Sequence, residues 1–229
     1  MKQPSLSLKE NADTLASRAA AAVEADILRG ALAPGARLGV AATAQRYGVG
    51  ATPLREGLSR LAARGLVDAV GHRGFRVRAI SCDDLADIVR VRRVLEREAM
   101  ALSVAAGDGA WEGEVVAALH RLKRHVEENA AGFGEGEPTF DALHRDFHAA
   151  LIAACGSPRL IGLCARLYDE AYRYRRIMMS RLPSRADFVV SHERLAEAAL
   201  ARRAQSAAAL AEAHIAATLA LVYPQGGAG

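Results

Sequence analysis

The sequence predicts a mainly α-helical protein: an N-terminal winged helix-turn-helix with a small β-hairpin wing, followed by a C-terminal all-α six-helix bundle. Three observations predict it. Hydrophobic residues make up 51% of the chain, and alanine, which favours helix, dominates them. Residues 41–77 contain two short helical patterns separated by a turn and followed by a glycine-rich hairpin. Beyond residue 80, helical patterns punctuated by Gly and Pro continue without strand-like alternation.

The first helix is expected over 14–32, where apolar residues recur at helical spacing until the turn at Pro34-Gly35. A second, short helix closes at Gly48, because a glycine just past a helix end takes the left-handed conformation at little cost. Thr52 is the expected N-cap of the third helix, with Pro53 at its first position.

The third helix should bury one face and expose the other. Three leucines recur on the buried face at spacings of four and three: Leu54, Leu58 and Leu61. Arg55 and Arg60 lie away from that face. Two short strands, 66–67 and 75–77, are expected to be joined through the turn at 71–74. Such a unit places its third helix in the major groove of DNA and its wing on the backbone or minor groove.

The helical half should begin at Ser81, an N-cap followed by two aspartates. Its helices are expected at about 82–106, 111–131, 138–155, 158–181, 185–202 and 205–222. Short loops between antiparallel helices make a bundle. The expected organisation is a flexible tail over 1–12, a winged helix-turn-helix DNA-binding domain over 13–79, a helical domain over 80–223, and a disordered tail over 224–229.

The charge is divided unevenly between the two halves. Residues 1–79 hold 12 Lys and Arg against 6 Asp and Glu, whereas the rest of the chain holds 18 against 20. A basic excess confined to the winged-helix segment is what a phosphate-binding module joined to a neutral partner domain would show.

Cysteine usage and hydropathy indicate a cytoplasmic protein. The three cysteines, Cys82, Cys155 and Cys164, are widely spaced and form no metal-finger pattern, so we expect reduced and mostly buried thiols. We expect no membrane span and no signal peptide, because no apolar run approaches about 18 residues and the N-terminus is polar.

The N-terminal motifs resemble those of the GntR family of bacterial transcription regulators, over about Leu15 to Val77. The matching segments are ILRGALAPGARL at 27–38, Gly48-Val49 and TPLREGL at 52–58. The family usually has Ser-Arg before Thr-Pro, and that arginine commonly contacts DNA, whereas this chain has Gly50-Ala51. Either the operator differs from the family norm, or base readout depends more on Arg55 and the wing.

The resemblance implies a homodimer that reads a pseudo-palindromic duplex operator, more often as a repressor. The residues expected at the DNA are Arg46, Thr52, Arg55, Arg60, His72, Arg73 and Gly74. Arg55 would contact a base, with guanine favoured, while Arg46, Arg73 or Arg76 would contact phosphates.

Histidines in the helical half suggest a metal site. His144 and His148 are four residues apart and so share a helix face, and His192 and His214 fall on the last two helices. Neutral imidazoles converging from three helices can hold a divalent cation. From composition alone, four separate hydrogen-bonded core or surface histidines would be the favoured interpretation.

The same half resembles the FCD ligand-binding domain of FadR-type GntR regulators. The resemblance rests on segments around Arg92–Glu96, Phe147–Leu151, Gly156–Leu160, Ser191–Glu193 and Ala213-His214. It implies that His148, His192 and His214 bind a metal such as zinc, nickel or a manganese-like ion. His144 stands where the family has an aspartate, so a four-histidine site and a weakened site with another metal preference are both open. Asp141 or Asp146 would be the carboxylate alternatives, with Asp141 better placed.

Arginines facing this pocket would capture a small carboxylate effector, because a guanidinium binds a carboxylate through two hydrogen bonds. Arg92 and Arg175 are the candidates, whereas Arg173 and Arg176 are interpreted as a solvated helix face. The leading hypothesis is therefore an effector-responsive transcription regulator. The alternatives are a helical metalloenzyme acting on a small organic acid, for which no general base or nucleophile motif is present, and an architectural DNA binder without an effector.

Overall fold

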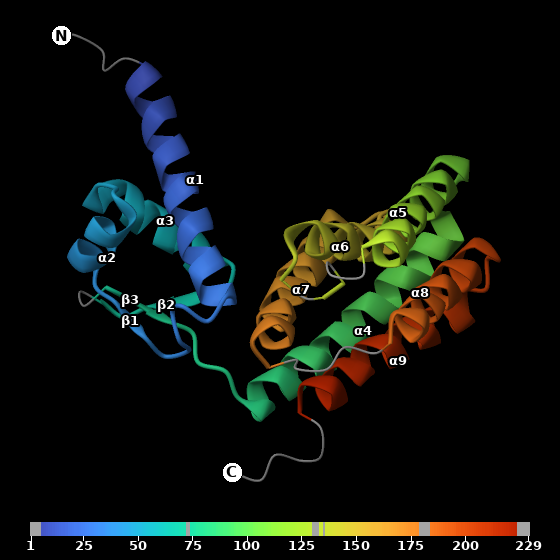
Figure 1. The fold of residues 1–229 in the computed structure, drawn as a ribbon. Coiled ribbons are helices and arrows are strands. Elements are labelled where there is room, and N and C mark those ends of the chain that lie inside the picture. The colour runs from blue at the N-terminus through green and yellow to red at the C-terminus, as the bar shows by residue number, and fades with distance from the viewer. Residues whose placement is uncertain (1–5, 72–73, 130–132, 135, 179–183, 224–229) are drawn as a thin grey trace. The chain divides into compact units, whose positions relative to one another are not determined.

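The computed structural model describes residues 6–71, 74–129, 133–134, 136–178 and 184–223. Their fold is mostly helical, as expected, with a small antiparallel sheet (Figure 1). The chain divides into two compact units, residues 1–80 and 81–229. The expected tail at 224–229 and the helix end expected at 181 fall on residues outside the described ones, whereas the helix expected to reach 131 ends at Glu128.

The first unit is a winged helix-turn-helix. Its elements, in chain order, are α1 (Leu6–Leu28), β1 (Arg37–Leu38), α2 (Val40–Tyr47), α3 (Ala51–Ala63), β2 (Val67–Ala69) and β3 (Phe75–Val77). Helix α2 ends at Gly48, whose φ of 62° is left-handed, as expected. The leucines Leu54, Leu58 and Leu61 are fully buried against α1, so the predicted inner face of α3 is confirmed.

Close packing between α1 and α3 depends on Gly57. A Cβ atom at this position would lie 2.8 Å from the carbonyl oxygen of Ala16 and 3.0 Å from the backbone nitrogen of Ala20. The two helix backbones therefore approach each other at a residue without a side chain, which fixes how α3 is presented.

Three details of this unit differ from the expectations. Helix α1 spans Leu6–Leu28, so residues 6–12 are helical rather than a loose tail, and the helix ends before the expected Leu32. Gly50, not Thr52, precedes α3, and no side chain caps that helix; Thr52 is an exposed residue of its first turn. The wing has a third strand, because β1 pairs antiparallel with β3 and gives the order β1-β3-β2.

The second unit is a bundle whose described residues form six helices. They are α4 (Cys82–Ala106), α5 (Gly109–Glu128), α6 (Pro138–Ile152), α7 (Pro158–Met178), α8 (Arg185–Leu200) and α9 (Ala204–Val222). The longest, α4, packs against α9 and α7, while α5 packs against α6 and α8 (Figure 1). The predicted cap at Ser81 is confirmed, because its hydroxyl accepts a hydrogen bond from the Asp84 amide.

The core of the bundle is aromatic and aliphatic, with Phe140 and Phe147 fully buried at its centre. Trp111 is part of this packing: it is buried, and its Nε1 donates to the carbonyl of Ala150. Cys155 and Cys164 are buried free thiols. Helix α9 is long and apolar enough to cross a membrane by length and composition alone, but here it lies along α4 as part of the bundle.

Candidate functional site

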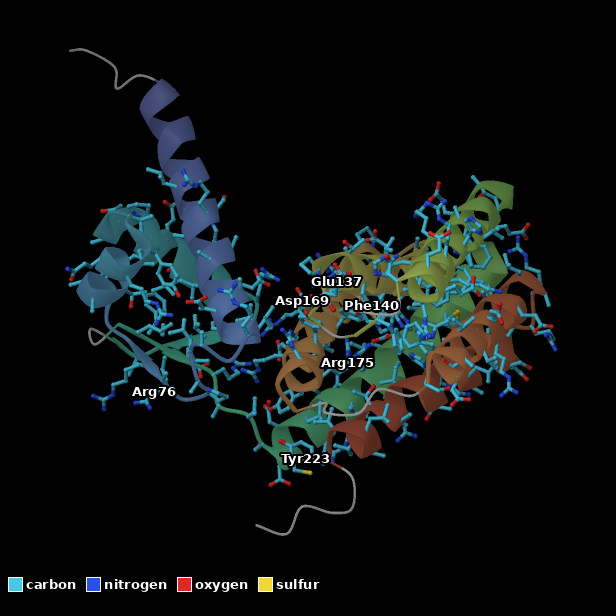
Figure 2. The ribbon with its side chains drawn as sticks, viewed as in Figure 1. Arg76, Glu137, Phe140, Asp169, Arg175 and Tyr223 are labelled. Carbon is cyan, nitrogen blue, oxygen red and sulfur yellow. The ribbon has the colours of Figure 1, made fainter. Side chains whose placement is uncertain are left out.

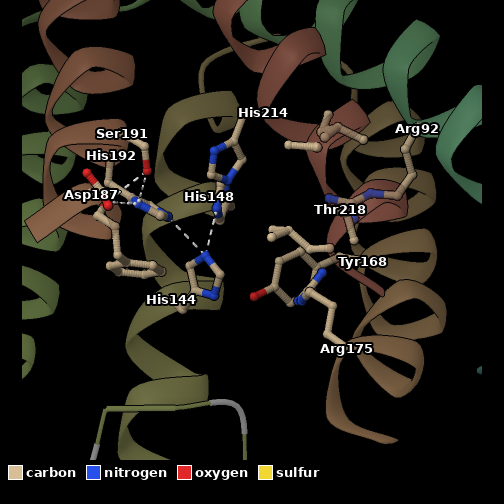
Figure 3. A pocket seen from close by; sticks show the side chains of 14 residues that line it. Arg92, His144, His148, Tyr168, Arg175, Asp187, Ser191, His192, His214 and Thr218 are labelled. Carbon is tan, nitrogen blue, oxygen red and sulfur yellow. Dashed lines mark hydrogen bonds between the residues drawn. The ribbon is translucent and has the colours of Figure 1, made fainter. Parts of the chain in front are cut away.

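A cavity of about 290 Å³ lies inside the second unit, between helices α4, α6, α7, α8 and α9. Figure 3 shows four histidine rings along one wall and Arg92, Tyr168 and Arg175 along the other. Leu221 and Ile215 of α9 also line the cavity. A concave, mostly apolar space with a few convergent polar groups is the usual form of a small-molecule site.

The four predicted histidines converge as a single cluster. His144 and His148 leave the same face of α6, His192 comes from α8 and His214 from α9. The Nε2 atom of His144 lies 3.0 Å from Nε2 of His148 and 3.0 Å from Nε2 of His192. One nitrogen from each of the four rings lies within 4.8 Å of the others. Neutral imidazole nitrogens at this separation suit a divalent ion such as zinc.

The surroundings keep these rings uncharged, as metal ligands must be. Burial, followed by the charge of neighbouring groups, holds the pKa of His144 and of His148 well below the usual value. Burial lowers the pKa of His192 to about 4, and burial together with His192 lowers the pKa of His214 to about 3. At neutral pH the wall therefore presents lone pairs and N–H groups, not positive charge.

A hydrogen bond orients one of the rings. Nδ1 of His192 lies 2.7 Å from the carbonyl oxygen of Phe188, one turn earlier on α8. A carbonyl can only accept, so Nδ1 must carry the proton, and in the neutral ring Nε2 then offers a lone pair to the cluster. The Phe188 ring stacks against the imidazole with centroids 4.0 Å apart, which fixes the plane of the ring.

The opposite wall carries positive charge. Arg92 of α4 and Arg175 of α7 are both buried, and Figure 2 labels Arg175 in the bundle. Nε of Arg92 donates to Glu96 at 2.6 Å, so Glu96 offsets part of the Arg92 charge. The guanidinium carbons of Arg92 and Arg175 lie 5.4 Å and 4.7 Å from the centre of the Tyr168 ring. The structure thus places both candidate effector residues on the cavity, as the sequence suggested.

The carboxylate alternatives do not hold, and one expectation about this region is wrong. Asp141 is not beside the histidines: its carboxylate accepts from the Gly136 amide and the Tyr172 hydroxyl, and Asp146 is exposed. Arg173 is not on a solvated face: it is fully buried, with Nη2 3.7 Å from Asp84. Both errors arose because helical spacing gives the direction of a side chain but not what packs against it.

Tyr168 is a pocket residue that the sequence reading missed. It lies seven residues, or about two helical turns, before Arg175 on α7, and both side chains line the cavity. This spacing puts the two residues on the same helix face and could have indicated Tyr168. Thr218 was missed as well; it lies four residues after His214 on α9 and lines the same cavity.

The candidate DNA-reading face belongs to the first unit. Thr52 and Arg55 are exposed on α3. Among the residues that the structure describes, none forms a hydrogen bond or ion pair with the Arg55 guanidinium. Arg60, by contrast, donates to Ser17 on α1 at 2.9 Å and lies 3.7 Å from Glu56. Arg55 is therefore the better placed of the two arginines to reach a base edge.

The structure describes only some of the remaining residues expected at the DNA. His72 and Arg73 lie outside the described residues. Gly74 has a φ of 98°, and a Cβ there would lie 2.9 Å from the Leu38 carbonyl oxygen, so the wing requires glycine for packing. Arg76 of β3 donates to the Gly35 carbonyl at 3.0 Å, on the sheet (Figure 2).

Arg46 is held by a buried carboxylate. Asp26 of α1 accepts from Arg46 at 2.7 Å and from the Tyr47 hydroxyl at 2.7 Å, and Arg29 also pairs with it. These bonds, first that of Tyr47, lower the pKa of Asp26. The Arg46 side chain is still 48% exposed, so a phosphate contact remains open to it while the network ties α1 to the end of α2.

Comparison with known proteins agrees with both halves. A family described as bacterial regulatory proteins, gntR family, matches residues 15–77, and the FCD domain matches residues 87–217. The chain is 36% identical over 205 residues to the uncharacterized HTH-type transcriptional regulator BphR of Paraburkholderia xenovorans, covering 87% of this chain and 82% of that protein. It is 34% identical over 194 residues to the HTH-type transcriptional repressor GlaR of Escherichia coli, covering 83% and 87%.

Solved structures share the fold. The E. coli protein McbR/YncC matches with a TM-score of 0.71 at 23% identity, covering 92% of this chain and 98% of that one. A GntR-type protein from Rhodococcus sp. RHA1 matches with a TM-score of 0.69 at 23% identity, covering 93% and 99%. The family matches and the curated relatives are regulators, not enzymes. This chain therefore belongs to the GntR family of bacterial transcriptional regulators, with an N-terminal helix-turn-helix unit and a C-terminal FCD domain.

Proposed function

We propose that this regulator is a homodimeric, cytoplasmic repressor whose operator binding responds to a small carboxylate, bound in the FCD cavity through a divalent metal ion. The observation that carries the proposal is the pairing of two walls across one cavity. Four uncharged histidines face Arg92 and Arg175 across about 290 Å³. Repression is supported by the description of the E. coli relative as a repressor.

The donor set supports a borderline metal such as zinc or nickel over magnesium or calcium. The described residues contribute four imidazoles and no carboxylate to the cluster, and oxygen-preferring ions are poorly served by nitrogen donors. The ion would supply a Lewis-acidic position for a carboxylate oxygen. Because neutral ligands leave its charge uncompensated, a carboxylate would be drawn to the ion and to the two arginines together.

Arg55 is assigned the recognition of the base sequence of the operator. It is exposed on α3, and a bidentate contact to guanine would contribute about 1–3 kcal/mol of discrimination. Position 51, where the family usually has an arginine, is alanine, so each half-site loses one such contact. We infer that the operator half-site is read by Arg55 together with the wing.

The test is selection of an operator from randomised duplex DNA, followed by anisotropy titrations with the selected and a scrambled duplex. Arg55→Ala should remove most of the preference for the selected duplex and bring its affinity close to the weak affinity for the scrambled one. Arg124→Ala, which removes an exposed arginine from the second unit, is the charge-matched control and should keep the preference. Unchanged specificity in Arg55→Ala would show that α3 is not the reading helix.

A further inference from the structure

Helix α7 contacts two different parts of the second unit through two of its faces. One face carries Tyr168 and Arg175 into the cavity. The next residue back from Arg175, Tyr174, points elsewhere: its side chain is fully buried, and its hydroxyl reaches the start of α4. A displacement of Arg175 along or around the helix axis must move Tyr174 with it, because the two residues share one helical turn.

The Tyr174 hydroxyl is used twice. It accepts a hydrogen bond from the Ser81 amide at 3.2 Å, and it donates to the carboxylate of Asp84. Burial, and then the hydrogen bond to Asp84, raises the pKa of Tyr174 to about 12, so the hydroxyl keeps its proton at neutral pH. Arg173 adds a charge to the same place, with Nη2 3.7 Å from Asp84.

These partners lie where the second unit begins. Ser81 is its first residue and follows Ile80, the last residue of the DNA-binding unit, directly in the chain. Ser81 also caps α4 through its hydroxyl, which accepts from the Asp84 amide at 3.1 Å. The same helix delivers Arg92 to the cavity further along. The first turn of α4 is thus joined at one side to the DNA-binding unit and at the other to Tyr174.

We propose that the Tyr174 hydroxyl is a positioning group that transmits cavity occupancy to the first turn of α4, by tying Ser81 and Asp84 to the helix that carries Arg175. This inference rests on the proposed metal and carboxylate site. A carboxylate bound to the ion and to Arg175 immobilises α7. The ordered helix then holds Tyr174 against Ser81, and the segment entering the DNA-binding unit becomes less mobile.

The experiment is hydrogen exchange followed by mass spectrometry on the full-length protein. The metal-free protein is compared with protein loaded with Zn²⁺ and acetate, since acetate is the smallest carboxylate and presumes nothing about the natural effector. The peptide that reports is the one spanning residues 79–86. Loading should slow exchange in this peptide about three- to tenfold, the size expected when one hydrogen bond is held more firmly.

Three variants separate transmission from general stability. Tyr174→Phe keeps the ring and loses the hydroxyl, so exchange at residues 79–86 should be fast and nearly insensitive to loading. Tyr172→Phe is the matched control, because it removes another hydroxyl of α7 that bonds a carboxylate, that of Asp141. It should respond like the wild type. Asp84→Asn, whose side-chain carbonyl still accepts from Tyr174, should also keep the response.

Loading is measured independently by the zinc- and acetate-induced rise in melting temperature, which Tyr174→Phe should retain, reduced by no more than the three- to tenfold coupling that it loses. If Tyr174→Phe loads and its exchange slows as in the wild type, the inference is wrong. It is equally wrong if the loaded wild type shows no change at residues 79–86. If the wild type does not load at all, the proposed site itself fails, and the inference fails with it.

Discussion

Loss of a single cluster histidine should remove most of the stabilisation that zinc gives. The chosen change is His192→Ala, because the Phe188 carbonyl fixes that ring with its Nε2 lone pair toward the cluster. An ion that binds only the folded state stabilises it by about 2.7 kcal/mol when its concentration is about 100 times its dissociation constant. A unit of this size gains about 2–4 °C per kcal/mol, so the wild type should melt about 5–11 °C higher with zinc.

Removing a direct ligand should weaken binding at least about 100-fold, which is the upper range for losing only an outer partner of a ligand. At the same zinc concentration the stabilisation then falls to about 0.4 kcal/mol, a shift of about 1–2 °C. The assay is differential scanning fluorimetry with and without zinc. The zinc-induced difference is compared, and not the absolute melting temperature, since deleting a buried ring also destabilises the metal-free protein.

His120→Ala is the control, because His120 is an exposed histidine of α5 outside the cluster. It should retain the full zinc-induced shift. The reasoning would be refuted if zinc did not raise the melting temperature of the wild type. It would also be refuted if the two alanine variants lost the shift equally, since adventitious binding to surface histidines would then explain it.

Two further outcomes are expected. In metal-free protein the free energy of unfolding should decrease as the pH is lowered from about 6.5 to 3. The low pKa values of His192 (about 4) and His214 (about 3) mean that the unfolded chain binds protons first, each unit of difference being worth about 1.4 kcal/mol. A urea titration series would measure the fall, and stability independent of pH over this interval would contradict the burial of neutral rings. Gly57→Ala should cost about 1–3 kcal/mol, because its methyl group meets the Ala16 backbone. The loss is measured in the full chain, by operator affinity and by hydrogen exchange across α1, rather than by melting an isolated fragment of residues 1–80. Unchanged hydrogen exchange across α1 would contradict the packing.

Much of the bundle was predictable because its helices are marked at their starts. Ser81, Pro138 and Pro158 each stand at or just before a helix start, where their chemistry favours initiation. The inner face of α3 was predictable for a similar reason, since three leucines at helical spacing can be buried together in only one way. The histidine cluster needed more than spacing: only the resemblance to a known domain indicated that three separate helices meet there.

What could not be predicted depends on contacts between distant segments. Strand β1 has two residues, too few to show any alternation, and it exists because β3 pairs with it. The burial of Arg173 follows from the packing of α7 on α4, which no local pattern records. The position of Asp141 on α6, one turn before His144, was compatible with a ligand role. Its carboxylate instead accepts hydrogen bonds from Gly136 and Tyr172, which lie on other segments.

The composition of the histidine cluster has a consequence for how such a sensor would behave in a cell. A cation held only by uncharged rings and a bound acid would each favour the other, and thermodynamic reciprocity makes the gain equal in both directions. A low metal concentration would then weaken the response to the acid, and a high acid concentration would strengthen binding of the metal. In the proposed regulator, the level of transcription would depend on the concentrations of the acid and of the metal together, and on neither one alone.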